Sequence, residues 1–381
     1  MTPAIRSISV LALESPGAAY EVVVASGLIE SLGSRCAALL PMARRALLVA
    51  DANVPAGLVA GARDSLNRAG VIAAECPVRA SEPDKSLATL EAILQAGVRH
   101  RLERGEPIVA LGGGIVGDVA GFAAAVYRRG VPVVHCPTTL LSMVDAAIGG
   151  KTGINLTVAG ALKKNMAGSF HHPVLVLCDV DMLRSLPARE LRSGLAECIK
   201  HALLGADWGD ASLLEFTRSA MPGVRSGDAG AWVELVARNV AIKARVVHAD
   251  PREERGDHGG RMVLNMGHTV GHAVEAVIGA AHGEAVALGI VAETVCAERL
   301  GVSAAGTADR VRGMLELAGL PARASGLPPS DVLIEAMRDD KKVAAGVIRL
   351  AVPTGGSPAC AVVELADTGV LIAGLDAIRE T

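Results

Sequence analysis

Residues 107–118 read PIVALGGGIVGD, a short apolar run followed at once by three consecutive glycines and a fourth at position 117. The apolar residues 108–111 predict a buried β-strand, and the residues after the glycines predict a helix. Glycines at such a turn let backbone N–H groups approach a phosphate, and the following helix N-terminus favours an anion. A tight turn without a ligand explains this stretch alone equally well.

The first half of the chain alternates between short β-branched runs and amphipathic segments of helix length, such as 86–99. The runs lie at 21–24, 47–50, 108–111 and 131–136. This alternation is typical of βαβ units around a mostly parallel sheet. We therefore predict a Rossmann-like, nucleotide-binding α/β domain over residues 1–178.

From about residue 187 the pattern changes to long segments rich in Ala, Leu, Glu and Arg with helical period. The predicted helices are 188–204, 231–248, 268–278, 284–300 and 307–318. Short strands are predicted at 347–352 and 361–365. The second predicted domain, 179–381, is therefore mainly α-helical and is expected to bind metal and substrate.

Composition limits the partners and the compartment. The chain has 381 residues, of which 51% are hydrophobic and only 2% aromatic, with a formal net charge of −3. Few rings and no excess of positive charge argue against a nucleic-acid partner. Seven cysteines without a C-x-x-C pair predict reduced thiols, and no apolar stretch reaches the roughly 18 residues that span a bilayer. We expect a cytoplasmic protein without a membrane partner.

The glycine turn departs from the standard dinucleotide fingerprint in two ways. More than 100 residues precede it, and the next strand ends in Cys-Pro-Thr138-Thr139 where that fingerprint has an acid. Asp51, at the end of an earlier predicted strand, is the acid that could hold a ribose hydroxyl. The sequence therefore predicts a variant nucleotide-binding domain.

A second glycine-rich segment contains Lys151 between Gly150 and Gly153. The backbone can bend close to a ligand there, and the ammonium group can reach an anion. A Walker A loop is excluded because its spacing requires glycine at position 145, which is Asp145. A flexible loop with a solvated lysine is the alternative interpretation.

Three histidines and a glutamate lie near glycines in apolar, helix-forming sequence. His268 and His272 are four residues apart, so both imidazoles project from one face of a predicted helix. Position 269 is threonine where H-E-x-x-H metalloproteases have glutamate, which argues against protease chemistry. With His282 before the next helix and Glu197 on another, nitrogen and oxygen donors with open positions predict a catalytic metal site. Any one of these histidines alone is more simply a core or surface residue.

Several motifs together resemble the 3-dehydroquinate synthase family of sugar phosphate cyclases over about residues 51–342. They are GGGIVGDVAGFAAA from Gly112, Arg129-Gly130, PTTLL from Pro137, VDAAIGGKTGIN from Val144, GLAECIK from Gly194 and NMGHTVGH from Asn265. The resemblance implies bound NAD, one divalent metal (zinc or cobalt), an active site between the two domains, and a homodimer.

The resemblance also implies a reaction, the conversion of 3-deoxy-D-arabino-heptulosonate 7-phosphate to 3-dehydroquinate and phosphate in the shikimate pathway of aromatic amino acid biosynthesis. Transient oxidation of a ring hydroxyl by NAD acidifies the neighbouring C–H, so phosphate leaves by elimination. The hydride returns, the ring opens, and an intramolecular aldol step closes the carbocycle. We therefore expect a phosphate-eliminating carbon–oxygen lyase with an anionic sugar-acid phosphate as its partner.

Site residues follow from matching the motifs. The implied metal ligands are Glu197, His268 and His282, so His272 faces substrate, although spacing alone suggests that His268 and His272 both bind metal. The implied substrate-contacting residues are Lys151, Asn165, Lys200, Lys243, Arg261, Asn265, His272, Lys341 and Lys342, with Arg129 reaching across the dimer. The implied cofactor-contacting residues are Asp51, Glu82, Lys85, Gly113, Gly114, Asp118, Thr138, Thr139, Asp145 and Lys164.

Some positions depart from the family pattern. Predicted loops near 156–164 and 250–260 are longer than usual, and Val180 and His201 stand where threonine and an aromatic residue are common. Two alternatives stay open: a cyclase with a neutral sugar phosphate substrate, and a glycerol dehydrogenase-like, metal-dependent polyol dehydrogenase that releases NADH. Arg261, Asn265 and the lysine pair favour a substrate with a carboxylate.

Overall fold

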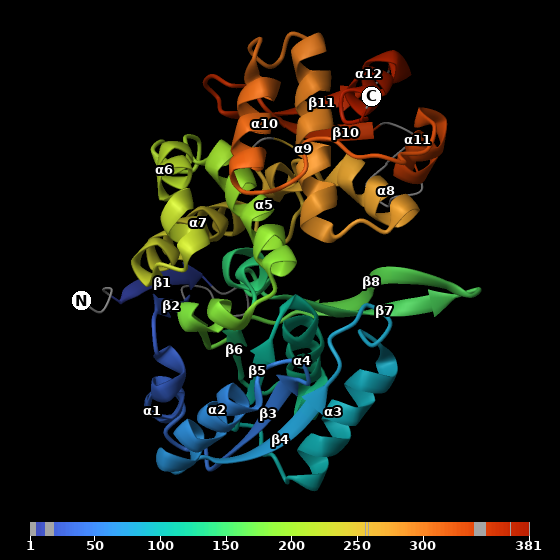
Figure 1. The fold of residues 1–381 in the computed structure, drawn as a ribbon. Coiled ribbons are helices and arrows are strands. Elements are labelled where there is room, and N and C mark those ends of the chain that lie inside the picture. Colours follow the sequence, from blue (N-terminus) through green and yellow to red (C-terminus); the bar gives the residue numbers. More distant parts are fainter. Residues whose placement is uncertain are drawn as a thin grey trace. The chain divides into compact units, whose positions relative to one another are not determined.

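The computed structural model describes residues 5–11, 19–255, 257, 259–338, 348–365 and 367–380 (Figure 1). Residue contacts divide the chain into two compact units. The first is Met1–Pro187 with Gly227–Val240, and the second is Ala188–Ser226 with Ala241–Thr381. The domain boundary after residue 178 stays a prediction. Within the described part of the chain, none of the helices combines the length and apolar character that a membrane crossing requires.

The first unit is built on a seven-stranded sheet with strand order β1-β2-β9-β6-β5-β3-β4. The strands are β1 (Arg6–Leu11), β2 (Ala19–Ala25), β3 (Arg45–Asp51), β4 (Ile72–Val78), β5 (Ile108–Gly112), β6 (Val133–Pro137) and β9 (Leu175–Asp179). Only β1 is antiparallel to its neighbour. The four predicted apolar runs lie in β2, β3, β5 and β6, so the mostly parallel α/β fold is confirmed.

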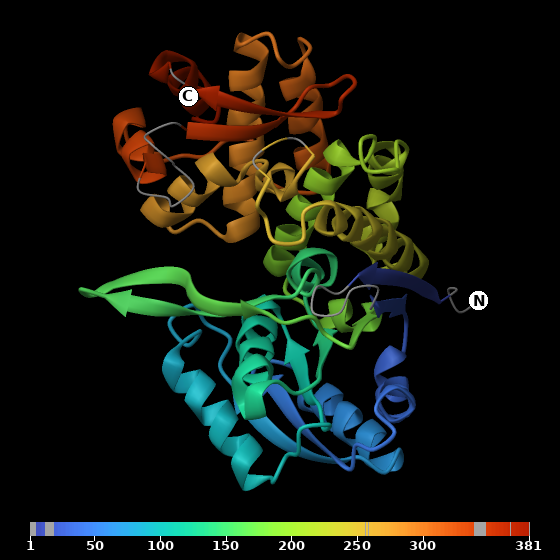
Figure 2. The same ribbon diagram turned by 180° about the vertical axis from the view of Figure 1, so that it is seen from behind.

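Helices cover both faces of this sheet (Figures 1 and 2). They are α1 (Leu32–Leu39), α2 (Ala56–Arg68), α3 (Leu87–Arg99) and α4 (Gly114–Val126), with the short helices η1 (Leu28–Ser31), η2 (Tyr127–Arg129), η3 (Ser142–Ala146) and η4 (Val180–Ser185). Leu47 and Val49 of β3 share one core cluster with α3 and α4. Leu48 between them is equally buried, because successive strand residues point to opposite faces, and α1 and α2 pack on that other face.

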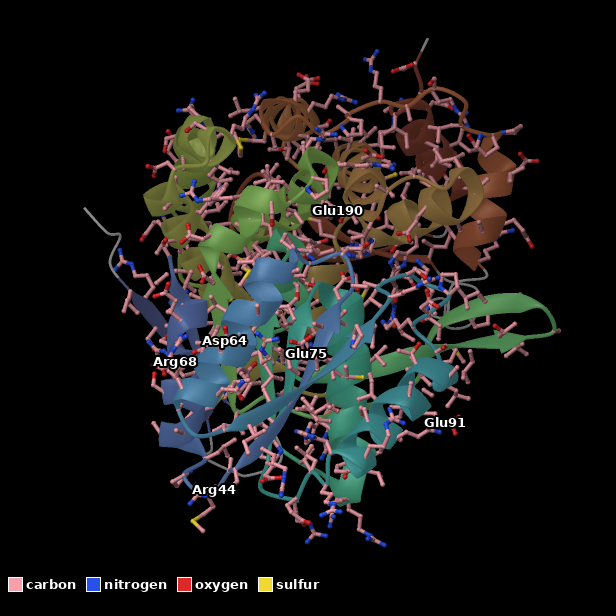
Figure 3. The ribbon with its side chains drawn as sticks, turned by 60° about the horizontal axis from the view of Figure 1, so that its bottom comes forward. Arg44, Asp64, Arg68, Glu75, Glu91 and Glu190 are labelled. Atoms are coloured by element: carbon pink, nitrogen blue, oxygen red, sulfur yellow. The ribbon has the colours of Figure 1, made fainter. Side chains whose placement is uncertain are left out.

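The outer sides of these helices are charged, as expected for amphipathic elements. Asp64 and Arg68 of α2 and Glu91 of α3 are exposed (Figure 3). Arg63 of α2 donates to Glu75 of β4 at 3.0 Å and so joins helix and strand across the surface. Such exposed pairs contribute little to stability, so the buried faces determine the fold.

Strands β7 (Lys151–Val158) and β8 (Ala161–Phe170) form a separate two-stranded antiparallel ribbon that packs on α4 and extends from the first unit (Figure 2). The prediction of a long loop near 156–164 is therefore wrong. Ala159 and Gly160 make the two-residue turn with φ of 50° and 82°, both left-handed, as a hairpin turn of this length requires. Alanine in the first of these positions gave no hairpin signal.

The second unit is mainly helical, as predicted. It contains α5 (Ala188–Leu204), α6 (Leu213–Ser226), the end of α7 (Ala229–Ala249), η5 (Arg261–Asn265), α8 (His268–Ile278), α9 (His282–Arg299), α10 (Thr307–Leu317), α11 (Ser330–Arg338), α12 (Thr368–Asp376) and the hairpin strands β10 (Ile348–Pro353) and β11 (Cys360–Leu365). Every helix and strand predicted in this part of the sequence is present. Helix α9 is buried along most of its length, and α5, α8, α10 and α12 pack against it.

Helices α8 and α9 approach each other closely because glycines line their contact. A Cβ atom at Gly289 of α9 would lie 1.9 Å from the carbonyl oxygen of Gly267, directly before α8. A Cβ atom at Gly271 would lie 3.0 Å from the carbonyl oxygen of Ala285. The backbones therefore leave no room for larger side chains at these positions.

We predict that Gly289→Ala lowers the free energy of unfolding by more than about 2 kcal/mol, because overpacking would force α8 away from α9. Gly313→Ala is the matched control, since Gly313 lies in exposed helix α10 with no described atom within 4 Å of its Cβ position. That variant should gain about 0.5–1 kcal/mol. Urea unfolding measures both, and equal midpoints for the two variants would contradict the packing argument.

His135 of β6 is buried under α4, and its ring lies 3.5 Å from the Cβ position of Gly117. Burial and, to a smaller extent, the nearby His171 together lower the pKa of His135 to about 4. The imidazole is therefore neutral in the folded protein at neutral pH, and protonation favours the unfolded chain.

This lowered pKa predicts acid sensitivity. The unfolded chain binds a proton at His135 below a pKa of about 6.5, whereas the folded chain does so only near 4, so stability falls as pH drops between these values. Between pH 7 and pH 5 the loss from His135 should be about 2 kcal/mol. His135→Gln should flatten the pH dependence of urea unfolding by that amount. An unchanged slope would show that His135 is not buried as a neutral group.

Candidate active site

A carboxylate and two imidazoles from three helices meet in the second unit. Glu197 lies on α5 and is 0% exposed, while His268 and His282 are the first residues of α8 and α9. Glu197 Oε1 lies 3.6 Å from His268 Nε2 and 3.5 Å from His282 Nε2. All three ligand atoms lie within 4.8 Å of one another. Ligands at about 2.0–2.1 Å from a tetrahedral zinc lie roughly 3.4 Å apart, so this cluster fits a divalent metal.

The second nitrogen of each imidazole is held by a separate acceptor. His268 Nδ1 donates to the carbonyl oxygen of Met266 at 3.1 Å, and His282 Nδ1 donates to Glu275 Oε2 at 3.2 Å. These contacts fix the ring orientation and leave both Nε2 atoms facing Glu197. Acceptors of this kind are what metal-binding histidines use to present the other nitrogen.

The cluster is strongly charged. Lys200, one turn after Glu197, forms an ion pair with its carboxylate, and both side chains are buried. Burial alone lowers the pKa of His282, but hydrogen bonds to Glu197 and Glu275 outweigh it and raise that pKa to about 9. Without a metal, positive charge from the lysine and this imidazole therefore balances the buried carboxylate.

His272 lies beside the cluster, one helical turn after His268. Its ring centroid is 5.3 Å from that of His268 and 6.5 Å from that of His282. In the described part of the chain, its nitrogens are not among the ligand atoms grouped with Glu197. The substrate-facing role of His272 stays a prediction.

The other predicted substrate-binding residues of this unit are mostly buried. Lys200 is 1% exposed, Lys243 of α7 is 6% exposed, and Arg261 of η5 is 2% exposed. Asn265 ends η5, which packs against α5. Lys341 and Lys342 lie outside the described residues.

The extended segment before Arg261 is organised by one carboxylate. Asp250 accepts backbone N–H groups of Glu254, Arg255 and Arg261, the last at 2.9 Å. Burial would raise the pKa of Asp250, but these backbone hydrogen bonds lower it. Arg261 also donates from its side chain to the carbonyl oxygen of Pro251 at 2.9 Å. Hydrogen bonds to Asp250 and to the carbonyl oxygen of Pro251 thus fix the position of Arg261.

In the first unit, half of the predicted cofactor residues lie at the carboxyl ends of parallel strands. Strand β3 has β4 on one side and β5 on the other, so the chain reverses direction across the sheet between β3 and β5. Ligands bind at such switch points in open α/β sheets. The predicted residues found at the ends of β3, β5 and β6 are Asp51, Gly113, Gly114, Thr138 and Thr139. Helix α4 begins at Gly114 and directs its N-terminus to the same edge.

A polar network continues this edge. The ammonium group of Lys85, a buried residue, contacts the carboxylate of Asp118 on α4 and the side-chain oxygen of Asn165 on β8. Burial raises the pKa of Asp118, and the charge of Lys85 partly offsets this. Lys164 lies 3.6 Å from Glu82 Oε1 on the surface. Five predicted residues from three segments thus form one group.

The remaining predicted residues of the first unit lie on its short elements. Asp145 is in η3 and Lys151 begins β7. Arg129 ends η2 with a left-handed backbone, φ 69°, and its side chain is exposed. The interpretation of Lys151 as part of a flexible loop is wrong, because the residue begins a strand.

Sequence reasoning missed Asn155, which holds this network in place. Its side chain donates to the carbonyl oxygen and to Oε2 of Glu82 at 2.9 and 2.8 Å, and it accepts the backbone N–H of Asn165 at 2.8 Å. Pairing of β7 and β8 shifts here, so that Asn155 faces a bulge and Asn165 adopts φ 54°. A buried asparagine directly after Gly-Ile was the available signal.

Two further residues that sequence reasoning missed are Glu275, which holds His282, and Glu293 of α9, which accepts backbone N–H groups beside His268. Glu275 lies seven residues before His282, in the same histidine-rich stretch. Neither acid lies in one of the motifs that carry the family resemblance. Their roles depend on the contact between α8 and α9.

The first unit is a parallel α/β fold with a glycine turn at its switch point. The helical unit next in sequence contains a carboxylate–imidazole cluster. Together these features define an enzyme of the Rossmann-like type with a helical metal-binding part. Sequence profiles described as 3-dehydroquinate synthase N-terminal and C-terminal match residues 75–193 and 194–343. The chain belongs to the 3-dehydroquinate synthase family.

Individual relatives agree with this assignment. The chain is 44% identical over 338 residues to a 3-dehydroquinate synthase from Symbiobacterium thermophilum, covering 88% of this chain and 91% of the relative. It is 38% identical over 375 residues to that of Roseobacter denitrificans, covering 96% and 98%. Among solved structures, the 2-epi-5-epi-valiolone synthase ValA of Streptomyces hygroscopicus, with NAD+ and Zn2+ bound, is 29% identical with a TM-score of 0.82, covering 97% and 98%.

We predict that His268→Ala abolishes binding of one divalent metal per chain and leaves the helical content unchanged, because the cluster loses one of three donors. Cobalt titration followed by absorbance, with circular dichroism for the fold, measures both. His248→Ala, an exposed histidine at the end of α7, is the control and should bind cobalt normally. Full binding by the His268 variant would rule out the proposed ligand set.

Proposed function

We propose that this protein converts 3-deoxy-D-arabino-heptulosonate 7-phosphate to 3-dehydroquinate and phosphate, through transient oxidation, phosphate elimination and intramolecular aldol closure. Membership of the family carries this proposal. The cluster of Glu197, His268 and His282 supports it, because its donor set and spacing suit a divalent metal.

The proposed cofactors follow from the residues that fit them. Glu197, His268 and His282 would hold zinc or cobalt, which would supply polarisation of the hydroxyl that is oxidised. The turn at Gly113 and Gly114 would hold NAD, which supplies the transient oxidation and is regenerated in each turnover. The presence of NAD+ and Zn2+ in the related ValA structure supports both assignments.

Substrate binding is assigned to the buried cations. Lys200, Lys243 and Arg261 are each less than 10% exposed in a protein whose net charge is −3. Cations at these buried positions suit a ligand with a phosphate and a carboxylate. We assign substrate contacts also to Lys151, Asn165, Asn265, His272, Lys341 and Lys342.

Phosphate elimination and aldol closure require proton transfers at the substrate. His272 lies next to the proposed metal ligands but outside their group, and an imidazole can accept or donate a proton near neutral pH. We therefore assign proton transfer to His272, with Lys200 orienting the carboxylate of Glu197.

We also propose that the protein is a homodimer in which Arg129 contributes to the site of the partner subunit. The exposed position of Arg129 after a left-handed residue supports this assignment. Sedimentation equilibrium of the protein and of Arg129→Ala, combined with activity, separates assembly from a direct contact with substrate.

We predict that the purified protein, given NAD, cobalt and the heptulosonate phosphate, releases one phosphate per substrate without accumulating NADH. The reason is that the hydride removed in the oxidation is returned to the same substrate. Phosphate release and absorbance at the NADH maximum measure the two quantities. Prior dialysis against a chelator should abolish turnover, and cobalt or zinc should restore it.

Other outcomes would contradict the proposal in different ways. Lasting NADH would indicate a polyol dehydrogenase, whereas turnover of a neutral sugar phosphate without turnover of the acid would indicate a different cyclase. Arg261→Lys is a useful companion variant, because it keeps the charge but removes the planar pair of donors that matches a carboxylate.

A further inference from the structure

Helix α8 begins without a cap from its own sequence. The residue before it, Gly267, is left-handed with φ 78° and has no side chain to accept a hydrogen bond. The first backbone N–H groups of a helix have no partner within the helix and need an acceptor. His268 occupies the first position of this helix, so whatever caps the helix also acts on the proposed metal ligand.

Glu293 of α9 supplies the missing acceptor. Its carboxylate accepts the backbone N–H of Gly267 at 2.7 Å through Oε2 and that of Val270 at 3.0 Å through Oε1. The two donors flank His268 in the chain, since Gly267 lies one residue before it and Val270 two residues after it. Glu293 is 0% exposed, so both hydrogen bonds are shielded from water.

Helices α8 and α9 cannot slide past each other at this contact. A Cβ atom at Gly289, one turn before Glu293, would lie 1.9 Å from the carbonyl oxygen of Gly267, so the start of α8 rests on the backbone of α9. His282, the second imidazole of the cluster, is the first residue of the same helix α9. One rigid contact therefore sets where both imidazoles lie relative to each other.

We propose that Glu293 is a positioning residue for metal binding: it anchors the first turn of α8 on α9 so that His268 and His282 face Glu197 together. This inference rests on the proposed metal site. Glu293 itself touches neither the metal nor the substrate. Its carboxylate also complements the positive end of α8, which an uncharged side chain would do less well.

The test is a cobalt titration of Glu293→Gln, followed by absorbance and without any activity measurement. Glutamine keeps the shape but places an NH2 group against one of the two backbone donors. Loss of an outer contact to a metal ligand typically weakens metal binding 10- to 100-fold, and we expect a change of this size together with an altered cobalt spectrum.

Asp179→Asn is the matched control. Asp179 is also a buried carboxylate that accepts backbone N–H groups, those of Gly27 and Ile29 at 2.9 Å each and that of Asp181 at 3.1 Å, but it lies in the first unit. That variant should lose stability without a change in cobalt affinity. If Glu293→Gln fails to fold, Glu293→Asp retains the charge on a shorter side chain and should show a smaller loss of affinity.

Unchanged cobalt affinity in a folded Glu293 variant would overturn the inference, provided that His268→Ala abolishes binding. Unchanged binding in His268→Ala would instead refute the metal site on which the inference rests. The two failures are therefore distinguishable in one set of titrations.

Discussion

The second unit is organised around a buried carboxylate that must be compensated. Glu197 lies inside a helical core where an isolated negative charge would be costly. Lys200 from the same helix and two imidazoles from two other helices surround it. Two of the three helices that meet at this point begin there, because His268 and His282 are the first residues of α8 and α9. The packing of the unit and its chemistry thus depend on the same contact.

The first unit follows a different constraint, the direction of a parallel sheet. The six strands β2, β9, β6, β5, β3 and β4 all run in the same direction, so the residues that follow them gather at one edge of the sheet. Asp51 and the glycine turn come from strands that are adjacent in the sheet yet about 60 residues apart in sequence, at the point where the strand order reverses. The network of Lys85, Asp118 and Asn165 connects this edge to the β7–β8 ribbon.

Strong periodicity explains what could be predicted from the sequence. The helices α5, α8 and α10 have nearly the predicted bounds, because their apolar residues recur with helical spacing and glycines or polar residues end them. The β7–β8 hairpin was not predicted, since its turn places alanine in a left-handed conformation that normally selects asparagine, aspartate or glycine. Strand β8 has no buried residue and β7 is buried only at residues 153–155, so the pair lacks the apolar alternation of a half-buried sheet.

The residues of the candidate site also fall into those that the sequence reveals and those that it does not. Residues with a chemical motif, such as His268 in its glycine setting, could be found from sequence, whereas Asn155, Glu275 and Glu293 act through contacts between distant segments. Asn155 is decisive only because β8 bulges opposite it, and nothing local to residue 155 predicts that bulge.

Two buried carboxylates in the second unit illustrate how structural and chemical roles separate. Glu197 is compensated by side chains that can exchange protons, so a divalent metal can replace that compensation and take the same oxygen. Glu293 is compensated by backbone N–H groups, which cannot be titrated or displaced in this way. The carboxylate of Glu293 therefore holds the start of α8. The type of partner, rather than burial or charge, decides which acid is suited to chemistry and which to position.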